Sequence, residues 1–153
     1  MFLTNHPIDL PLIQVCIMIA VGVLMIGVNY AADAQRLHFR QQNGNCMIWG
    51  KKAEYIVAEY TTDNGKKMTS LLLTSGYWAI SRHFHYIPEI MAAALWSMPA
   101  GFSVFLPYFY LTFVTILLFD RAFRDDARCH AKYQKHWDKY TERVPALIIP
   151  KIL

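Results

Sequence analysis

Residues 123–145, near the end of the sequence, gather acidic, basic, thiol, imidazole and aromatic side chains in one stretch. Ten of these 23 residues are Lys, Arg, Asp or Glu. Because positions three or four apart share one face of a helix, one row is predicted to contain Asp125, Cys129, Lys132, His136 and Tyr140. We expect a helix from about 120 to 143, closed by Pro145, because the residue before a proline resists the helical conformation. Such a row has the side chains for proton transfer, metal binding or contact with a nucleotide.

A zinc site is the first chemistry to weigh, since Cys129, His130 and His136 are possible ligands. Cys129 and His130 are neighbours, and neighbouring side chains point apart on a helix. The other two cysteines, Cys16 and Cys46, lie far outside the spacing of known zinc motifs. The sequence therefore predicts no metal here.

An aromatic stripe adjoins the row at Tyr133, Trp137 and Tyr140. A solvated amphipathic helix is the ordinary interpretation of a segment so rich in charge. Three large aromatic side chains beside Asp, Lys and Cys are more typical of the wall of a pocket. The pattern alone leaves both interpretations open.

Phosphate binding would have to rely on side chains, because the seven glycines form no GxGxxG or P-loop pattern. Arg36 and Arg40 are four residues apart and share one helix face. They can anchor that helix at a membrane surface, where basic residues mark the cytoplasmic side. They can also clamp phosphates, because a guanidinium fork matches phosphate oxygens.

Two histidines, His83 and His85, lie in the aromatic segment 71–90. Imidazoles near neutral pH can act as acids or bases. Histidines that are buried and satisfied by their neighbours are the more common case among aromatic side chains.

The elements that must position these groups include two long uncharged runs. Residues 10–32 contain no charge, which is enough for one helix across a bilayer. All fifteen Lys and Arg residues occur at or after Arg36. Because basic residues mark the cytoplasmic side, the N-terminus is predicted to face the lumen and the polar segments the cytosol. No basic stripe with interleaved aromatics predicts nucleic-acid binding.

The second uncharged run, residues 90–119, is too long for one straight span and short for two. Pro99 and Gly101 disfavour a continuous helix, so we expect a helical hairpin that enters the bilayer and returns, with one tilted span as the alternative. Asp63-Asn64-Gly65 predicts a β-hairpin turn. The predicted fold is an all-α polytopic membrane protein with one small β-hairpin. Its segments are a transmembrane helix 11–32, a cytosolic segment 33–89, the membrane hairpin 90–119, and a cytosolic helix and tail 120–153.

Three blocks of the sequence resemble the C-terminal part of the sterol reductase family. They are "LHFRQQNGNCMIWGKK", "LLLTSGYWAISRHFHY" and "LPYFYLTFVTILLFDRAFRDDARCHAKYQKHWDKYTERVP". The last block carries the family signature at Arg124, Asp125, Cys129, Lys132 and Tyr133. The similarity extends over nearly the whole chain, while family members have several further membrane helices at the front.

The resemblance implies NADPH-dependent reduction of a sterol ring double bond, of the Δ7 type, in the endoplasmic reticulum membrane with the C-terminus in the cytosol. It implies a cofactor pocket that faces the cytosol and is built largely from this region. The residues that match the family's cofactor-binding positions are Arg36, Arg40, Leu73, Trp78, His85, Tyr86, Asp125, Cys129, His130, Ala131, Lys132, Tyr133 and Tyr140. His85 stands where the family usually has Asn. Arg36 and Arg40 are expected to favour NADPH over NADH through the extra phosphate. His85 and Tyr86 are candidate proton donors by position alone, and the missing front helices are the alternative source of the donor.

The implied partners are a sterol, the lipid bilayer, and the N-terminal helices of a parent chain or a partner membrane protein. Two other classes remain open from sequence. One is a non-catalytic membrane scaffold derived from a reductase. The other is an isoprenylcysteine-type methyltransferase that uses S-adenosylmethionine, although "RDDARCHAKY" favours the reductases.

Overall fold

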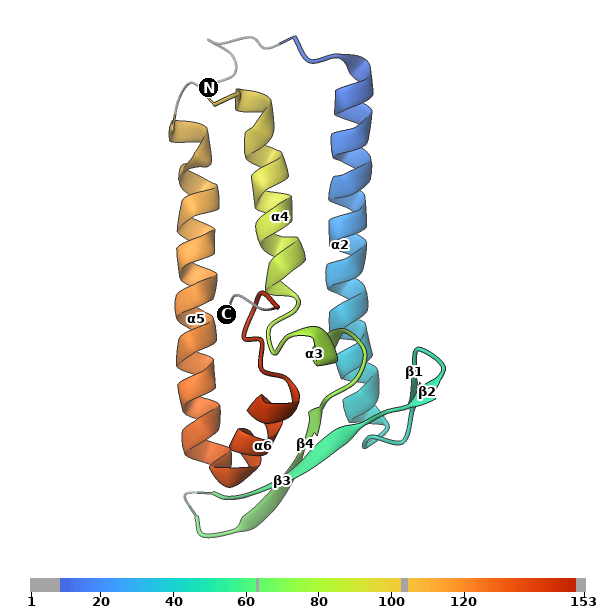
Figure 1. Cartoon of the computed structure of the whole chain (residues 1–153), viewed down its shortest axis with the longest axis vertical. Helices are drawn as coiled ribbons and strands as arrows, with labels where there is room; N and C mark the ends of the chain where they lie inside the picture. The colour runs from blue at the N-terminus through green and yellow to red at the C-terminus, as the bar shows by residue number, and fades with distance from the viewer. Residues whose placement is uncertain (1–8, 63, 103–104, 151–153) are drawn as a thin grey trace.

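Three long helices lie side by side, with small β-hairpins at one end (Figure 1). The computed structural model describes residues 9–62, 64–102 and 105–150. The main elements are α2 (Leu12–Gln41), β1 (Met47–Ile48), β2 (Lys51–Lys52), β3 (Tyr55–Thr61), β4 (Lys67–Leu73), α3 (Tyr77–Ile80), α4 (Tyr86–Ser97), α5 (Phe109–Tyr133) and α6 (Lys135–Arg143). The fold is mostly helical, as predicted, and α4 packs between α2 and α5.

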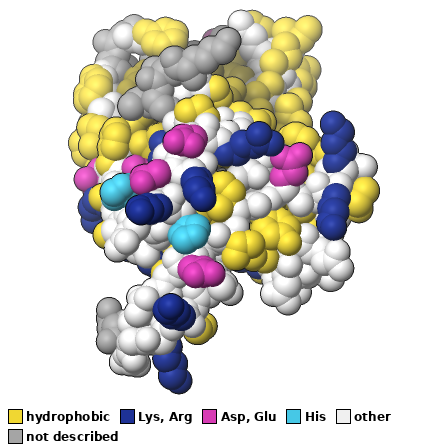
Figure 2. All heavy atoms as spheres, turned by 60° about the horizontal axis from the view of Figure 1, so that its bottom comes forward, with side chains coloured by type: hydrophobic (Ala, Val, Ile, Leu, Met, Phe, Trp, Pro, Cys, Tyr) yellow, Lys and Arg dark blue, Asp and Glu magenta, His cyan; other side chains and the backbone are white. Residues whose placement is uncertain are grey.

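Two helical stretches are long and apolar enough to cross a membrane, Leu12–Gln41 and Leu106–Tyr133. The apolar part of α2 is exposed almost throughout, and only Ala32 and Phe39 are buried. The helix continues past residue 32, the predicted end of the transmembrane part, and Arg36 and Arg40 lie on its last two turns. Their predicted position on a helix is therefore confirmed. Figure 2 shows hydrophobic side chains gathered over the helical part and charged side chains over the opposite end.

The break expected in the second apolar run is present. Helix α4 ends at Ser97, a short 3-10 turn covers Met98–Ala100, and Gly101 has φ of +66°. Helix α5 then runs antiparallel to α4 (Figure 1). One continuous tilted span, the alternative interpretation, is therefore wrong, because Pro99 and the left-handed Gly101 end the helix.

The predicted β-hairpin is confirmed as β3 and β4, which pair antiparallel from Tyr55 with Leu73 to Thr61 with Lys67. The amide of Thr62 donates to the carbonyl of Lys66 at 2.9 Å and closes the connection. Asp63, part of the predicted turn, lies outside the described residues. A second small hairpin, β1–β2, was not predicted. Its turn places Trp49 at φ +49° before Gly50, and tryptophan is not a usual residue for that conformation.

The single helix predicted over 120–143 is wrong. Helix α5 begins before that range and ends at Tyr133, and α6 follows after Gln134, which has φ of +47°. The predicted row is therefore divided between two helices that meet at a corner. The corner lets Trp137 and Tyr140 pack under β3 and β4 against Ile56 and Leu72, where a straight helix would carry them into solvent.

The segment after α6 is not a free cytosolic tail. Val144, Leu147 and Ile148 are buried, and the last two join the core formed by α4 and α5. The amide of His83 donates to the carbonyl of Leu147 at 2.9 Å, and that of Arg82 to Ala146 at 3.0 Å. Residues 144–148 therefore hold the loop between α3 and α4 in place.

Candidate functional site

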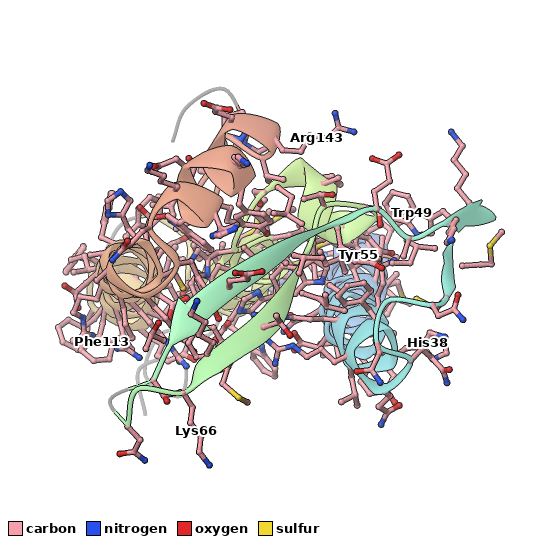
Figure 3. The ribbon with its side chains drawn as sticks, turned by 90° about the horizontal axis from the view of Figure 1, so that it is seen from below. His38, Trp49, Tyr55, Lys66, Phe113 and Arg143 are labelled. Atoms are coloured by element: carbon pink, nitrogen blue, oxygen red, sulfur yellow. The ribbon has the colours of Figure 1, made fainter. Side chains whose placement is uncertain are left out.

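A narrow cavity of about 90 Å³ lies where the end of α2, strand β4, the α3–α4 loop and the α5–α6 corner converge. The hairpin β3–β4 crosses beneath the helix ends there, as the view from below shows (Figure 3). Most of the residues predicted to contact a cofactor line this cavity: Arg36, Arg40, Leu73, Trp78, Asp125, Cys129, Tyr133 and Tyr140. Segments that are far apart in sequence thus form one site.

Trp78 fixes one wall of the cavity. Its indole Nε1 donates to the carbonyl of Ala32 on α2 at 3.0 Å, and the side chain is almost fully buried. The guanidinium carbon of Arg36 lies 4.5 Å from the centre of the Trp78 ring, in cation–π geometry. This contact directs Arg36 toward the cavity, which an arginine serving only as a membrane anchor does not require.

The amide of Tyr77 binds α2 as well, since it donates to Oε1 of Gln35 at 3.0 Å. Gly76 precedes it with φ of +68°, a conformation that glycine adopts without strain. These contacts set the position of the short helix that carries Trp78.

The opposite wall comes from α5, where Asp125, Cys129 and Tyr133 are spaced by four residues and form a stripe. The rings of Tyr133 and Trp137 are 6.2 Å apart, and those of Trp137 and Tyr140 are 4.9 Å apart. The predicted aromatic stripe is present, and it lines the cavity together with Asp125 and Cys129. Burial raises the pKa of Tyr140 to about 12, so its hydroxyl keeps its proton at neutral pH.

Arg82 braces the site from the loop before α4. Its Nη1 forms an ion pair with Oδ1 of Asp126, and its Nη2 donates to the carbonyl of Pro145 at 3.1 Å. The same carboxylate oxygen accepts a hydrogen bond of 3.1 Å from Nε1 of Trp137. Asp126 therefore connects α5, α6 and the α3–α4 loop.

His85 and Tyr86, which were also predicted as cofactor contacts, lie beside the cavity and do not line it. The ring of His85 is 5.3 Å from that of Trp78 and 4.3 Å from that of Tyr86. Burial lowers the pKa of His85, which favours the neutral imidazole. Its buried Nδ1 has no hydrogen-bond partner among the described residues. An atom of this kind is available to a bound group.

His83 lines the cavity, with Nε2 at 3.9 Å from Oδ2 of Asp125. Burial lowers its pKa to about 4, although the nearby Asp125 acts in the opposite direction. The His83 imidazole is therefore neutral at pH 7. This agrees with the second of the two interpretations from sequence, in which the histidine is buried among its neighbours.

Three predicted contacts, His130, Ala131 and Lys132, do not line this cavity. Nε2 of His130 lies 3.1 Å from Oδ1 of Asp138 on the exposed surface. Ala131 and Lys132 face a second, larger groove on the far side of Tyr133. A helix turns about 100° per residue, so consecutive positions cannot all face one cavity.

Sequence reasoning missed Phe39 and Arg82 as residues of the cavity. Phe39 belongs to the apolar face of α2 and showed no distinguishing signal. Arg82 is an isolated charge between aromatic segments, and a charge that must be buried needs a partner. The sequence therefore indicated that a buried Arg82 would need an acidic partner. It did not indicate which one, because Asp126 lies 44 residues away.

The donor set fits an anionic, partly aromatic ligand. Arg36 and Arg40 bring two guanidinium groups to the cavity, and Asp126 rather than Asp125 pairs with Arg82. Trp78 and Tyr133 offer flat apolar surfaces, and Asp125 offers acceptor oxygens. Such a set can bind phosphate oxygens and pack against planar rings.

Acid pH is expected to weaken the fold through His83. The pKa of its folded form, about 4, lies below the unfolded value of roughly 6.5, so the unfolded chain binds the proton more readily. The stabilisation is complete above pH of about 6.5 and declines as the pH falls toward 4, by about 1.4 kcal/mol per unit. Thermal unfolding in detergent micelles between pH 7.5 and 4.5 measures this decline.

A His83→Gln variant should lose less stability over that pH interval than the unmodified chain. His38→Gln is the control, because His38 is exposed and lies on the outside of α2 (Figure 3). Identical pH profiles for the His83→Gln variant and the unmodified chain would contradict the assignment.

Comparison with known proteins places the chain among the sterol reductases. The profile of the ergosterol biosynthesis ERG4/ERG24 family matches residues 1–153. The chain is 52% identical over 152 residues to a 7-dehydrocholesterol reductase of Arabidopsis thaliana, covering 99% of this chain and 35% of the relative. It is 40% identical over 151 residues to a Delta(14)-sterol reductase of Methylotuvimicrobium alcaliphilum, covering 99% and 33%.

A 7-dehydrocholesterol reductase of Xenopus laevis is 36% identical over 150 residues, with 98% of this chain and 32% of the relative covered. The chain thus spans about a third of the length of the curated relatives it matches. The match to the family profile includes the segments that converge on the cavity, from α2 through α6. The resemblance predicted from three blocks of sequence is confirmed, and the chain belongs to the ERG4/ERG24 family of sterol reductases.

Proposed function

We propose that this chain forms the cofactor-binding part of a membrane enzyme that reduces a sterol ring double bond with NADPH. Family membership supports the reaction class, and the names of its relatives support a sterol substrate. Relatives named for both 7-dehydrocholesterol and Δ14 activities match this chain. The 52% identity to one 7-dehydrocholesterol reductase favours the Δ7 bond, whereas another, at 36%, is less similar to the chain than the Delta(14)-sterol reductase, at 40%.

One observation carries the cofactor assignment. Eight of the residues at family cofactor positions, which are spread from α2 to α6, line a single cavity: Arg36, Arg40, Leu73, Trp78, Asp125, Cys129, Tyr133 and Tyr140. A membrane scaffold that binds no ligand would not need two guanidinium groups, a carboxylate and aromatic rings in one cavity. The geometry therefore favours a reductase over a scaffold.

Each wall has a distinct task in this proposal. Arg36 and Arg40 bind phosphate oxygens, and the stacking of Arg36 on Trp78 restricts the guanidinium to the cavity. Trp78 and Tyr133 pack against flat rings, and Asp125 accepts hydrogen bonds from hydroxyl or amide groups. Bound NADPH supplies the hydride.

Reduction of an isolated alkene also needs a proton, which the protein must deliver. His83 and His85 are neutral near pH 7 because burial lowers the pKa of each, so neither holds an imidazolium ready to donate. The unpartnered Nδ1 of His85 is instead suited to orienting a polar group of the ligand. The hydroxyl of Tyr86, whose ring centre lies 4.3 Å from that of His85, is one candidate proton donor by position. The helices that this chain lacks are the other source of a donor.

Charge and exposure support the proposed membrane placement. The apolar parts of α2 and α5 cross the bilayer, and the charged end of the molecule faces the cytosol (Figure 2). We assign the enzyme to the endoplasmic reticulum, with the N-terminus of this chain in the lumen and residues 120–150 in the cytosol. Residues 1–8, which are most of the segment before the predicted transmembrane helix 11–32, lie outside the described residues.

The experiment begins with titration of the purified chain in lipid nanodiscs with NADPH and with S-adenosylmethionine. Binding of NADPH alone supports a reductase. Binding of S-adenosylmethionine alone would replace the proposal with a methyltransferase, and binding of neither would favour the scaffold.

Turnover is expected to need more of the enzyme than residues 1–153. The apolar faces of α2 are exposed, and three helices leave a rigid four-ring sterol open to water. Membranes that contain only this chain, from cells lacking their own reductase, should bind NADPH without reducing 7-dehydrocholesterol or a Δ14-sterol. Conversion by this chain alone, abolished by Asp125→Ala, would show that the sterol site lies within these helices.

A further inference from the structure

The small hairpin β1–β2 stands beside the end of α2 and presents an apolar tip (Figure 1). Met47 is 63% exposed and Trp49 is 62% exposed, although both are large apolar side chains. Trp49 has φ of +49° and Gly50 has φ of +76°, the pattern of a tight turn that favours Asn-Gly. The turn itself therefore gives no reason for tryptophan at this position. An exposed side chain held in an unfavourable backbone conformation indicates a role outside the hairpin.

The base of the hairpin is fixed to the body of the protein. Ile48 and Ala53 are buried in one cluster with Phe39 of α2. The amide of Ala53 donates to the carbonyl of Cys46 at 3.0 Å and closes the hairpin. Because its base is packed and hydrogen-bonded in this way, the tip is held in a set position relative to α2.

Contacts through α3 place the tip at the level where the apolar part of α2 ends. The ring centre of Trp49 lies 5.0 Å from that of Tyr77 on α3. The amide of Tyr77 in turn donates to Oε1 of Gln35 on α2 at 3.0 Å. Gln35 lies two residues beyond Asp33, the charge that ends the uncharged run of α2. In the proposed membrane placement Trp49 is thus level with the membrane surface, where Trp and Tyr are enriched.

Positive charge lies next to this tip. Between Asp33 and Glu54 the sequence has four Lys or Arg residues and no acidic residue. Two of the four, Lys51 and Lys52, form strand β2 and are exposed. Neither forms an ion pair with a carboxylate among the residues that the structure describes. Glu54, the next acidic residue, pairs with Arg143 at 2.7 Å. The two ammonium groups are therefore available to an external anion.

We propose that the β1–β2 hairpin binds anionic phospholipid, with Trp49 among the upper acyl chains and Lys51 and Lys52 on the headgroups. The proposal is separate from the cofactor assignment and rests on the membrane placement in the proposed function. Basic side chains just outside a transmembrane helix attract the anionic lipids of the cytoplasmic leaflet. The apolar tip is buried in the interface while the ammonium groups stay at the headgroup level. A soluble anion would pair with the lysines and leave Met47 and Trp49 in water, so lipid fits the whole tip better.

The test measures how strongly phosphatidylserine and phosphatidylcholine quench the fluorescence of Trp49. Each lipid carries bromine in the upper part of its acyl chains and is diluted into nanodiscs of unbrominated phosphatidylcholine. Subtracting the quenching of a Trp49→Asn variant isolates this residue, and the variant should fold because asparagine suits the turn. Half-maximal quenching of Trp49 should need at least about tenfold less phosphatidylserine than phosphatidylcholine, because two lysines near the surface attract the anionic headgroup.

Lys51→Ala/Lys52→Ala should reduce the preference to within about twofold, and about 1 M salt should weaken it in the unmodified chain, because salt screens exposed charges. The matched control is Lys66→Ala/Lys67→Ala, which removes the same charge at the start of β4. Lys66 and Trp49 lie at opposite ends of the view from below (Figure 3). The control should keep the preference, and thermal unfolding verifies that each variant is folded.

Equal quenching of Trp49 by the two lipids overturns the proposal, as does a preference that persists in Lys51→Ala/Lys52→Ala. Trp96 distinguishes this failure from failure of the membrane placement. It is 81% exposed on the apolar helix α4 and should be quenched by both lipids, as subtraction of a Trp96→Phe variant measures. If Trp96 is quenched and Trp49 is not, the tip lies in water and the hairpin proposal alone fails. If neither is quenched, the membrane placement fails and the hairpin proposal fails with it.

Discussion

Replacing Arg36 and Arg40 together by alanine is expected to weaken NADPH binding by at least about tenfold. Both guanidinium groups line the first cavity, and each can form charge-assisted hydrogen bonds with phosphate oxygens. Contacts of this kind contribute about 1.5–3 kcal/mol each, and partial exposure to solvent reduces that amount. Calorimetric titration of the variant in nanodiscs with NADPH and NADH measures the loss.

The loss should be larger for NADPH than for NADH, because Arg36 and Arg40 are expected to favour the extra phosphate of NADPH. Lys51→Ala/Lys52→Ala is the charge-matched control and should retain NADPH affinity. Extraction with alkaline carbonate shows whether the arginine variant is still embedded in the membrane. Unchanged NADPH affinity would return Arg36 and Arg40 to the role of membrane-surface anchors.

Replacing Arg82 by alanine is expected to destabilise the fold by about 3 kcal/mol, which is typical when one partner of a buried ion pair is removed. The Arg82 side chain is 11% exposed, while that of Asp126 is 34% exposed. The variant leaves the Asp126 carboxylate with one partner, the indole of Trp137, and leaves the carbonyl of Pro145 without the Arg82 donor. Thermal or denaturant unfolding in detergent micelles measures the change.

Arg124→Ala provides the comparison on the neighbouring α5 surface. Arg124 pairs with Asp120 at 2.9 Å, but both side chains are more than half exposed. Exposed pairs contribute about 0–1 kcal/mol, so this variant should unfold almost as the unmodified chain does. If Arg82→Ala and Arg124→Ala lower the free energy of unfolding by the same small amount, the Arg82–Asp126 ion pair is not important for stability.

The sequence predicted two local features correctly, because a few residues determine the backbone conformation at each. Pro99 and Gly101 indicated the break between α4 and α5, and the β-branched and apolar run around Asn64 and Gly65 indicated the β3–β4 hairpin. In both cases the signal lies within a few residues of the feature. The resemblance to a family supplied the set of cofactor positions, and the structure brings most of them together.

Features that depend on distant contacts were not predictable from local pattern. The corner at Gln134 exists because Trp137 and Tyr140 are buried beneath the hairpin, and nothing in the local sequence marks Gln134 as a position of positive φ. The single predicted helix therefore treated Lys132 and His136 as neighbours on one face. Arg82 was overlooked for the same reason, since its carboxylate partner belongs to α5.

The return of residues 144–148 into the helical core has a consequence for the order of events during synthesis. A ribosome adds about 5–20 residues per second, so α4 and α5 are made seconds before the segment that completes their core. Until Ala146 and Leu147 emerge, the amides of Arg82 and His83 lack their carbonyl partners. The first cavity is consequently complete only after α6 and residues 144–148 have been made. A nascent chain stalled before residue 144 should therefore be open to proteases at the α3–α4 loop.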